Sequence, residues 1–144
     1  MKTDGSEAGR NHTPPDDAPP QRIAADIVQS FLSAMERRDL DAARTYLSPN
    51  FVMIFPGNAR FTDLQELVSW GQQRYRAIGK SYTRFDAVDD GETTIVYCFG
   101  TLHGIQLDGT EFNDIRFIDR FTVCDDTLLD QQVWNDMGEV LGSA

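Results

Sequence analysis

One carboxyl side chain stands among apolar residues in the segment 110–123, and it is the first candidate for chemistry. Polar and apolar residues alternate in this segment, which is typical of a β-strand with one buried face. The buried face takes the odd positions: Asn113, Ile115, Phe117, Asp119, Phe121 and Val123. A carboxyl group on an apolar face needs a partner or takes up a proton. We predict Asp119 as a catalytic acid or base and Asn113 as a ligand contact; the alternative for Asp119 is a structural ion pair.

His103 is the second candidate, because imidazole is the side chain that changes charge near neutral pH. The chain has two histidines, and the other, His12, lies in a proline-rich stretch. We predict His103 as a proton carrier, with a structural residue at the rim of the sheet as the alternative. Tyr97 shares its strand parity with His103. Tyr97, Tyr75 and Trp70 belong either to the core or to a ligand pocket, since a buried Tyr or Trp needs a partner for its polar end.

Composition argues against several classes of partner and cofactor. The net charge is −10, from 23 acidic and 13 basic residues, whereas nucleic-acid binding depends on Lys and Arg that neutralise phosphates. We therefore expect neither nucleic acid nor an anionic membrane as a partner. The cysteines, Cys98 and Cys124, have no zinc-ligand spacing and are expected to be buried free thiols. No glycine-rich phosphate loop is present, and we expect no metal and no cofactor.

The chain is expected to be one cytoplasmic domain preceded by a tail. Residues 1–20 contain four prolines and no Ile, Leu, Val or aromatic residue, a composition typical of disorder. No apolar run approaches the ~20 residues that span a bilayer. The first residues also lack the apolar core of a signal peptide. The length of the remainder, 21–144, suits a single domain.

Helices come first in this domain and strands follow. Apolar residues recur every fourth position from Ile23 to Met35, which predicts a helix, and Asp39 or Asp41 is placed to cap a short second one. A short strand is expected at 51–55. A third helix is expected from a cap at Thr62 to about residue 78. Period-two alternation then predicts strands near 82–89, 93–104, 110–123 and 127–138, with Asp-Gly turns. This order is an α+β arrangement.

The layout, and above all the segment from Ile118 to Asp136 (IDRFTVCDDTLLDQQVWND), resembles the nuclear transport factor 2-like superfamily. Within it the chain is most similar to SnoaL-like polyketide cyclases and ketosteroid isomerases, over roughly Ile23 to Val140. The resemblance implies a cone: a strongly curved, mostly antiparallel sheet that encloses a cavity with three helices. It also implies a homodimer formed through the convex face, where strand parity places Trp134 and Ile118.

The resemblance extends to individual positions. Asp119 falls where ketosteroid isomerases have the protonated aspartic acid of their oxyanion hole. Phe31 falls at the position of the partner tyrosine and Phe55 near that of the general base, so that steroid isomerisation by that route lacks two groups. Hairpin geometry and the resemblance together place Gln131, Val133 and Asn135 on the cavity face. We predict these three, with Phe31 and Phe55, as site residues, and Asn135 as an oxyanion or orienting donor.

Two functions follow as hypotheses. The first is a cofactor-independent enzyme, of isomerase or lyase type, that cyclises, isomerises or dehydrates a small, partly apolar carbonyl compound. The second is a non-catalytic domain of the same fold that binds a small ligand or mediates dimeric interaction.

Overall fold

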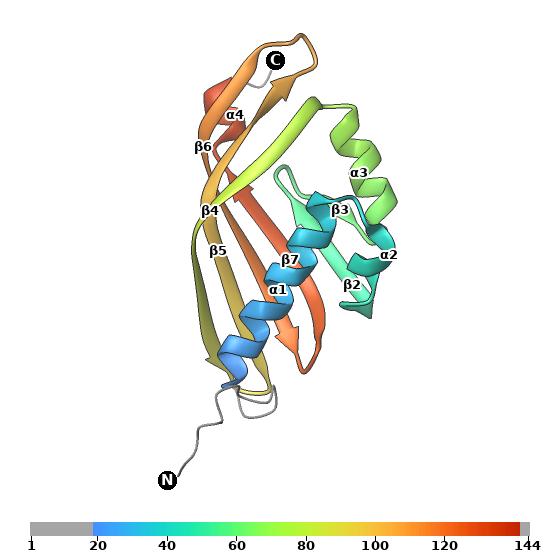
Figure 1. Cartoon of the computed structure of the whole chain (residues 1–144), viewed down its shortest axis with the longest axis vertical. Coiled ribbons are helices and arrows are strands. Elements are labelled where there is room, and N and C mark those ends of the chain that lie inside the picture. The colour runs from blue at the N-terminus through green and yellow to red at the C-terminus, as the bar shows by residue number, and fades with distance from the viewer. Residues whose placement is uncertain (1–18, 142–144) are drawn as a thin grey trace, which may run out of the picture.

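A strongly curved six-stranded sheet forms the centre of the molecule (Figure 1). The computed structural model describes residues 19–141, so most of the expected tail lies outside the described residues. Within the described range the elements are α1 (Pro20–Glu36), α2 (Leu40–Arg44), β2 (Leu47–Phe55), β3 (Ala59–Phe61), α3 (Leu64–Gln72), β4 (Tyr75–Asp90), β5 (Thr93–Gln106), β6 (Glu111–Cys124), β7 (Thr127–Asn135) and α4 (Met137–Leu141). The strand order is β3-β2-β7-β6-β5-β4, and every neighbouring pair is antiparallel except β2 and β7. The predicted α+β fold with a curved, mostly antiparallel sheet is confirmed.

Helix α1 covers the concave face of the sheet and packs against β4, β5 and β6 (Figure 1). Its apolar side is buried, and the ring of Phe31 meets those of Phe51 and Phe121 edge to face at 6.1 and 5.9 Å. Phe31, Phe51 and Phe121 are all less than a tenth exposed. The core therefore lies between α1 and the sheet, and it anchors the middle of β6, where Asp119 lies. None of the described helices is both long and apolar enough to span a membrane.

The third helix is shorter than predicted, and the strand after it is longer. Helix α3 ends at Gln72, and β4 begins at Tyr75 and pairs with β5 along its whole length. Tyr75 and Ile78 fit a helical stripe and a strand equally well, and pairing with β5 decides between them. The helix cap is Asp63, whose carboxylate accepts the Glu66 N–H at 3.0 Å, and not Thr62. Lys80 consequently lies within a strand of the sheet.

A bulge in β6 reverses the predicted orientation of Asn113. Leu102 pairs with Ile115 while Gly104 pairs with Phe112, so β6 has one extra residue at this point. Asp114, in the bulge, adopts a left-handed backbone conformation with a φ of 59°. Phe112 is therefore buried and Asn113 is exposed, and the prediction that Asn113 faces the cavity is wrong. Strand alternation assumes an uninterrupted strand, and nothing in the sequence marks the bulge.

Candidate functional site

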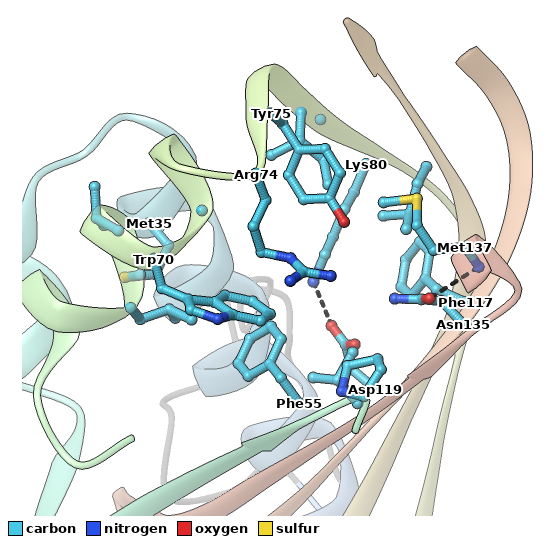
Figure 2. Close-up of a pocket in the computed structure, with 18 of the residues that line it drawn as sticks. Met35, Phe55, Trp70, Arg74, Tyr75, Lys80, Phe117, Asp119, Asn135 and Met137 are labelled. Atoms are coloured by element: carbon cyan, nitrogen blue, oxygen red, sulfur yellow. Dashed lines mark hydrogen bonds and ion pairs between the residues drawn. The ribbon is translucent and has the colours of Figure 1, made fainter. Parts of the chain in front are cut away.

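The concave face of the sheet, α1, α3 and α4 enclose a partly open cavity of about 1450 Å³ (Figure 2). Eight of the predicted site residues line it: Phe31, Phe55, Trp70, Tyr75, Asp119, Gln131, Val133 and Asn135. Its wall mixes aromatic side chains with charged and amide groups. This combination is typical of a small-molecule site, in which an apolar wall supplies affinity and a few polar groups orient the ligand.

Asp119 lies at the base of the cavity and is fully buried, with 0% of its side chain exposed. It is on β6, opposite Cys98 of β5 and Val133 of β7. Its Oδ2 atom accepts a hydrogen bond from the Lys80 ammonium group at 2.5 Å. Its Oδ1 atom has no hydrogen-bond partner among the described residues. A buried carboxylate with a vacant acceptor position is costly unless a ligand or proton uses it.

Lys80 is a residue of the candidate site that sequence reasoning missed, as are Tyr82 and Arg74. It extends from β4 over the ring of Phe117, with Nζ 5.0 Å from the ring centroid, and it keeps 26% of its side chain exposed. The prediction of a helix to about residue 78, with the next strand starting only near residue 82, left Lys80 out of the sheet. The signal that could have found it is its parity with Tyr82 in an alternating segment, because both side chains then point to one face.

Tyr82 and Cys98 lie close to the same carboxylate. Burial, and then the negative charge of Asp119, raise the pKa of the Tyr82 phenol. The same two causes raise the pKa of the Cys98 thiol, partly opposed by Lys80. Tyr82 lines the cavity, and part of its solvent-accessible surface faces the cavity. Both groups therefore stay protonated at neutral pH: the phenol is able to donate a hydrogen bond, and the thiol is not activated as a nucleophile.

Asn135 supplies an amide at the other side of the cavity. Its Oδ1 atom accepts the backbone N–H of Met137 at 3.0 Å, which ties the end of β7 to the start of α4. This contact fixes the orientation of the amide, and its Nδ2 group points into the cavity (Figure 2). Gln131 and Val133 lie on the same strand as Asn135 and also line the cavity. Both are less than a tenth exposed.

An aromatic cluster forms the wall between α3 and β2. The ring of Trp70 lies 5.8 Å from that of Phe55 and 5.2 Å from that of Phe61. The guanidinium of Arg74 lies over Trp70 at 4.5 Å from the ring centroid (Figure 2). Tyr75 packs against Phe112 at 5.8 Å. These flat side chains are suited to contact with a planar ligand.

His103 and Tyr97 are not part of the cavity wall. Because Cys98 lies opposite Asp119, the alternate residues of β5 point to the convex face, where Tyr97 lies opposite Arg120. His103 is exposed there, next to Gly79. His103 and Tyr97 share one face of the sheet, as predicted, but this face is the convex one and not the predicted cavity face. Both faces of β5 carry apolar residues, so its pattern alone does not tell the concave side from the convex one.

The described residues, 19–141, contain no group of three or more His, Cys, Asp or Glu side chains placed to hold a metal ion. The polar groups that line the cavity include carboxylates, an ammonium, guanidinium groups, phenols and amides.

Comparison with known proteins agrees with this architecture. The model of the SnoaL-like domain family matches residues 28–130. No curated protein matches the chain in sequence. Among solved structures, TerC co-crystallised with polyporic acid superposes with a TM-score of 0.69 at 14% identity, covering 83% of this chain and 95% of that one.

Two further structures show how widely the fold is used. A putative SnoaL-like polyketide cyclase from Jannaschia sp. CCS1 gives a TM-score of 0.64 at 15% identity, covering 88% of this chain and 96% of that one. The CaMKII hub of S. rosetta gives 0.65 at 17% identity, covering 82% and 98%. Identities this low establish a common fold and leave function open. With the match of the family model over most of its length, the chain belongs to the SnoaL-like domain family.

Proposed function

We propose that the chain is a cofactor-independent enzyme of isomerase or lyase type that acts by proton transfer on a small, partly apolar carbonyl compound. One observation carries the proposal: Asp119 is fully buried at the cavity, with one oxygen held by Lys80 and the other without a partner among residues 19–141. A carboxylate held in this way is suited to take a proton from a bound ligand and to return it.

The proposed roles follow from the neighbours of Asp119. Its Oδ1 atom removes a proton from the carbon next to the carbonyl group and returns it to another atom of the substrate, or to a departing hydroxyl. The Lys80 ammonium holds the carboxylate in place. The amide of Asn135 and the phenol of Tyr82 donate to the carbonyl oxygen, where negative charge develops. Two ionisable groups within hydrogen-bond distance, Lys80 and Asp119, favour catalysis over simple binding.

The comparisons support this proposal at the level of the fold. The putative polyketide cyclase and the protein crystallised with polyporic acid share the fold. The expected substrate is therefore an aromatic, terpenoid or polyketide-like carbonyl compound, of a size that a cavity of about 1450 Å³ accommodates.

The test is exchange of the acidic protons of a neutral ketone. The protein is incubated with 2-tetralone in D₂O, and loss of the signal of the protons next to the carbonyl is followed by proton NMR. We expect the protein to accelerate exchange and Asp119→Asn to lower the rate by about 10²-fold or more. The matched control is Asp130→Asn, since Asp130 is a half-buried carboxylate of β7 whose residue lies out of the cavity lining. An equal rate for wild type and Asp119→Asn would contradict the proposal.

The alternative is a non-catalytic domain that binds a ligand or associates with a second copy. The observation that favours it is the convex face, where Ile118 pairs with Trp134 across two strands and the two residues are 38% and 52% exposed. One structural neighbour is a hub domain. We propose that the protein is a cytoplasmic homodimer in either case. Ligand binding without any proton exchange would favour the non-catalytic function.

A further inference from the structure

We propose that the ligand of the cavity is a planar aromatic compound that carries a carboxylate, and that Arg74 binds this carboxylate. The inference rests on the proposed function of the same cavity and names the class of its substrate. It depends on the position of Arg74, on the other cations of the cavity and on the shape of the wall.

Arg74 is an exposed residue at the end of α3, and its side chain contacts two aromatic rings of the cavity wall. Its backbone N–H donates to the carbonyl of Gly71 at 3.0 Å and closes the last turn of α3. Its guanidinium carbon lies 4.5 Å from the ring centroid of Trp70 and 5.9 Å from that of Tyr75. A guanidinium that contacts aromatic rings through its face keeps its N–H groups, which lie in its plane, available to an acceptor.

The other cations of the cavity have acceptors of their own. Lys80 is paired with Asp119, Arg76 donates to the carbonyl of Leu107 at 3.0 Å, and Arg38 donates to that of Met35. Within residues 19–141, the guanidinium of Arg74 has no hydrogen-bond or ion-pair partner. An arginine that lies against aromatic rings and has vacant donors is suited to a carboxylate, which accepts two parallel N–H groups.

The wall beside Arg74 selects a flat ligand. Trp70 and Phe55 lie on one side of the guanidinium and Tyr75 on the other, and the Lys80–Asp119 pair lies deeper in the cavity (Figure 2). A planar ring placed against Trp70 or Tyr75 would have its carboxylate near Arg74. The other end of such a ring would point toward Asp119 and Asn135, where a carbonyl or hydroxyl group finds a donor and an acceptor.

The experiment compares two probes that differ in charge and hardly in shape, 2-naphthoate and 2-naphthamide. Their affinities for the full chain are measured by isothermal titration calorimetry at neutral pH. We expect wild type to bind the carboxylate about 10-fold more tightly or better, as for a hydrogen bond to a charged group. Arg74→Gln should reduce this ratio to about one, and Arg74→Lys should keep part of it.

The matched control is Arg84→Gln. Arg84 is on β4, the strand that begins directly after Arg74, and its guanidinium lies 5.9 Å from the ring centroid of Phe99, but this residue is not among those that line the cavity. Arg84→Gln should keep the wild-type ratio, so an equal loss in both variants would indicate a long-range charge effect and overturn the assignment. Equal affinities of wild type for the two probes would overturn it as well, as would no detectable binding of either at millimolar concentration.

These outcomes are separable from those of the proposed function, because 2-tetralone is uncharged. If exchange depends on Asp119 but the two naphthalene probes bind with equal affinity, the proposed carboxylate group of the ligand is rejected and the proposed enzymatic function stands. If the protein prefers 2-naphthoate to 2-naphthamide in a way that depends on Arg74 but catalyses no exchange, the carboxylate ligand stands and the proposed enzymatic function is rejected.

Discussion

Lys80 and Asp119 form an ion pair that runs diagonally across β5. Lys80 lies opposite Leu102 of that strand, whereas Asp119 lies opposite Cys98, four residues away along the same strand. The lysine spans this offset by extending over the ring of Phe117. The pair therefore links the edge of the sheet to its centre, and its two members differ greatly in exposure, at 26% and 0%.

This difference in exposure predicts that removing one charge of the pair and removing the other have unequal effects on the free energy of unfolding. Lys80→Met leaves a fully buried carboxylate without its partner, a change that costs on the order of 3–5 kcal/mol in buried pairs. Asp119→Asn leaves an ammonium that is able to turn toward solvent, so we expect a loss of about 1–2 kcal/mol at most. Urea unfolding of both variants at neutral pH measures the two values. A larger loss for Asp119→Asn than for Lys80→Met would contradict the unequal burial of the pair.

Cys98 should make the protein less stable at alkaline pH. Burial, and then Asp119, raise the pKa of the folded thiol above its ordinary value of 9.0. Above about pH 9 the unfolded chain loses this proton and the folded chain keeps it. The free energy of unfolding is therefore unaffected by this group below pH 9 and falls above it, by up to ~1.4 kcal/mol per pH unit.

The measurement is urea unfolding from pH 8 to 11. Cys98→Ala should be less stable at neutral pH, because it leaves a small void in the core, but its stability should fall less steeply above pH 9. Cys124→Ala, at the end of β6, removes the other thiol and is the control for the loss of a cysteine side chain as such. An unchanged slope in Cys98→Ala would show that the thiol does not contribute.

Gly100 should be intolerant of a side chain, unlike Gly71. A Cβ atom at position 100 would lie 2.1 Å from the carbonyl oxygen of Ser81 and 2.9 Å from the ring of Phe117, whereas one at position 71 meets nothing within 4 Å. Gly100→Ala should therefore shift the strand pairing beside Lys80 and destabilise the fold by several kcal/mol, about the upper range for single substitutions. Gly71→Ala, in α3, should be neutral or stabilising by up to about 1 kcal/mol. Thermal melts of the two variants compare them directly.

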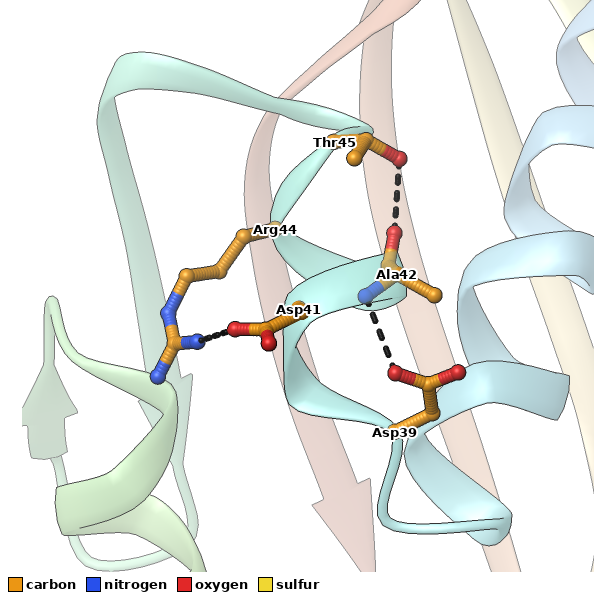
Figure 3. Close-up of polar contacts among 5 residues, drawn as sticks. All are labelled: Asp39, Asp41, Ala42, Arg44 and Thr45. Atoms are coloured by element: carbon orange, nitrogen blue, oxygen red, sulfur yellow. Dashed lines mark hydrogen bonds and ion pairs between the residues drawn. The ribbon is translucent and has the colours of Figure 1, made fainter.

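The sequence was a good guide at several features that local chemistry decides, although it placed the cap of the third helix at Thr62 instead of Asp63. Asp39 was one of two candidate caps for the second helix, and its carboxylate accepts the Ala42 N–H at 3.2 Å, while Asp41 pairs with Arg44 (Figure 3). The hairpins at the Asp-Gly turns and the apolar stripe of α1 also appear where they were predicted. Each of these features depends on residues that are close together in the chain.

Non-local contacts decided the rest. The alternation in β6 correctly placed Asp119 on a buried face, but its partner Lys80 is 39 residues away and comes from a segment that was partly read as helix. The side of β5 that carries His103 depends on its register with β6, and the burial of Phe112 instead of Asn113 depends on a bulge. The short elements β3 and α4 were not predicted, since each is stabilised by contacts with β2 or β6 more than by its own sequence.

The convex face should hold a homodimer together. Trp134 is 52% exposed beside Ile118, and large apolar residues that are paired on one face of a sheet are typical of an interface. We expect sedimentation at micromolar concentration to give a dimer, and Trp134→Glu to give a monomer with an unchanged fold by circular dichroism. Leu107→Glu is the matched control, because Leu107 is equally exposed, at 52%, but lies in the turn after β5. A wild-type monomer, or a dimer that survives Trp134→Glu, would contradict this interface, whereas a loss of dimer in Leu107→Glu alone would move it to the β5–β6 hairpin.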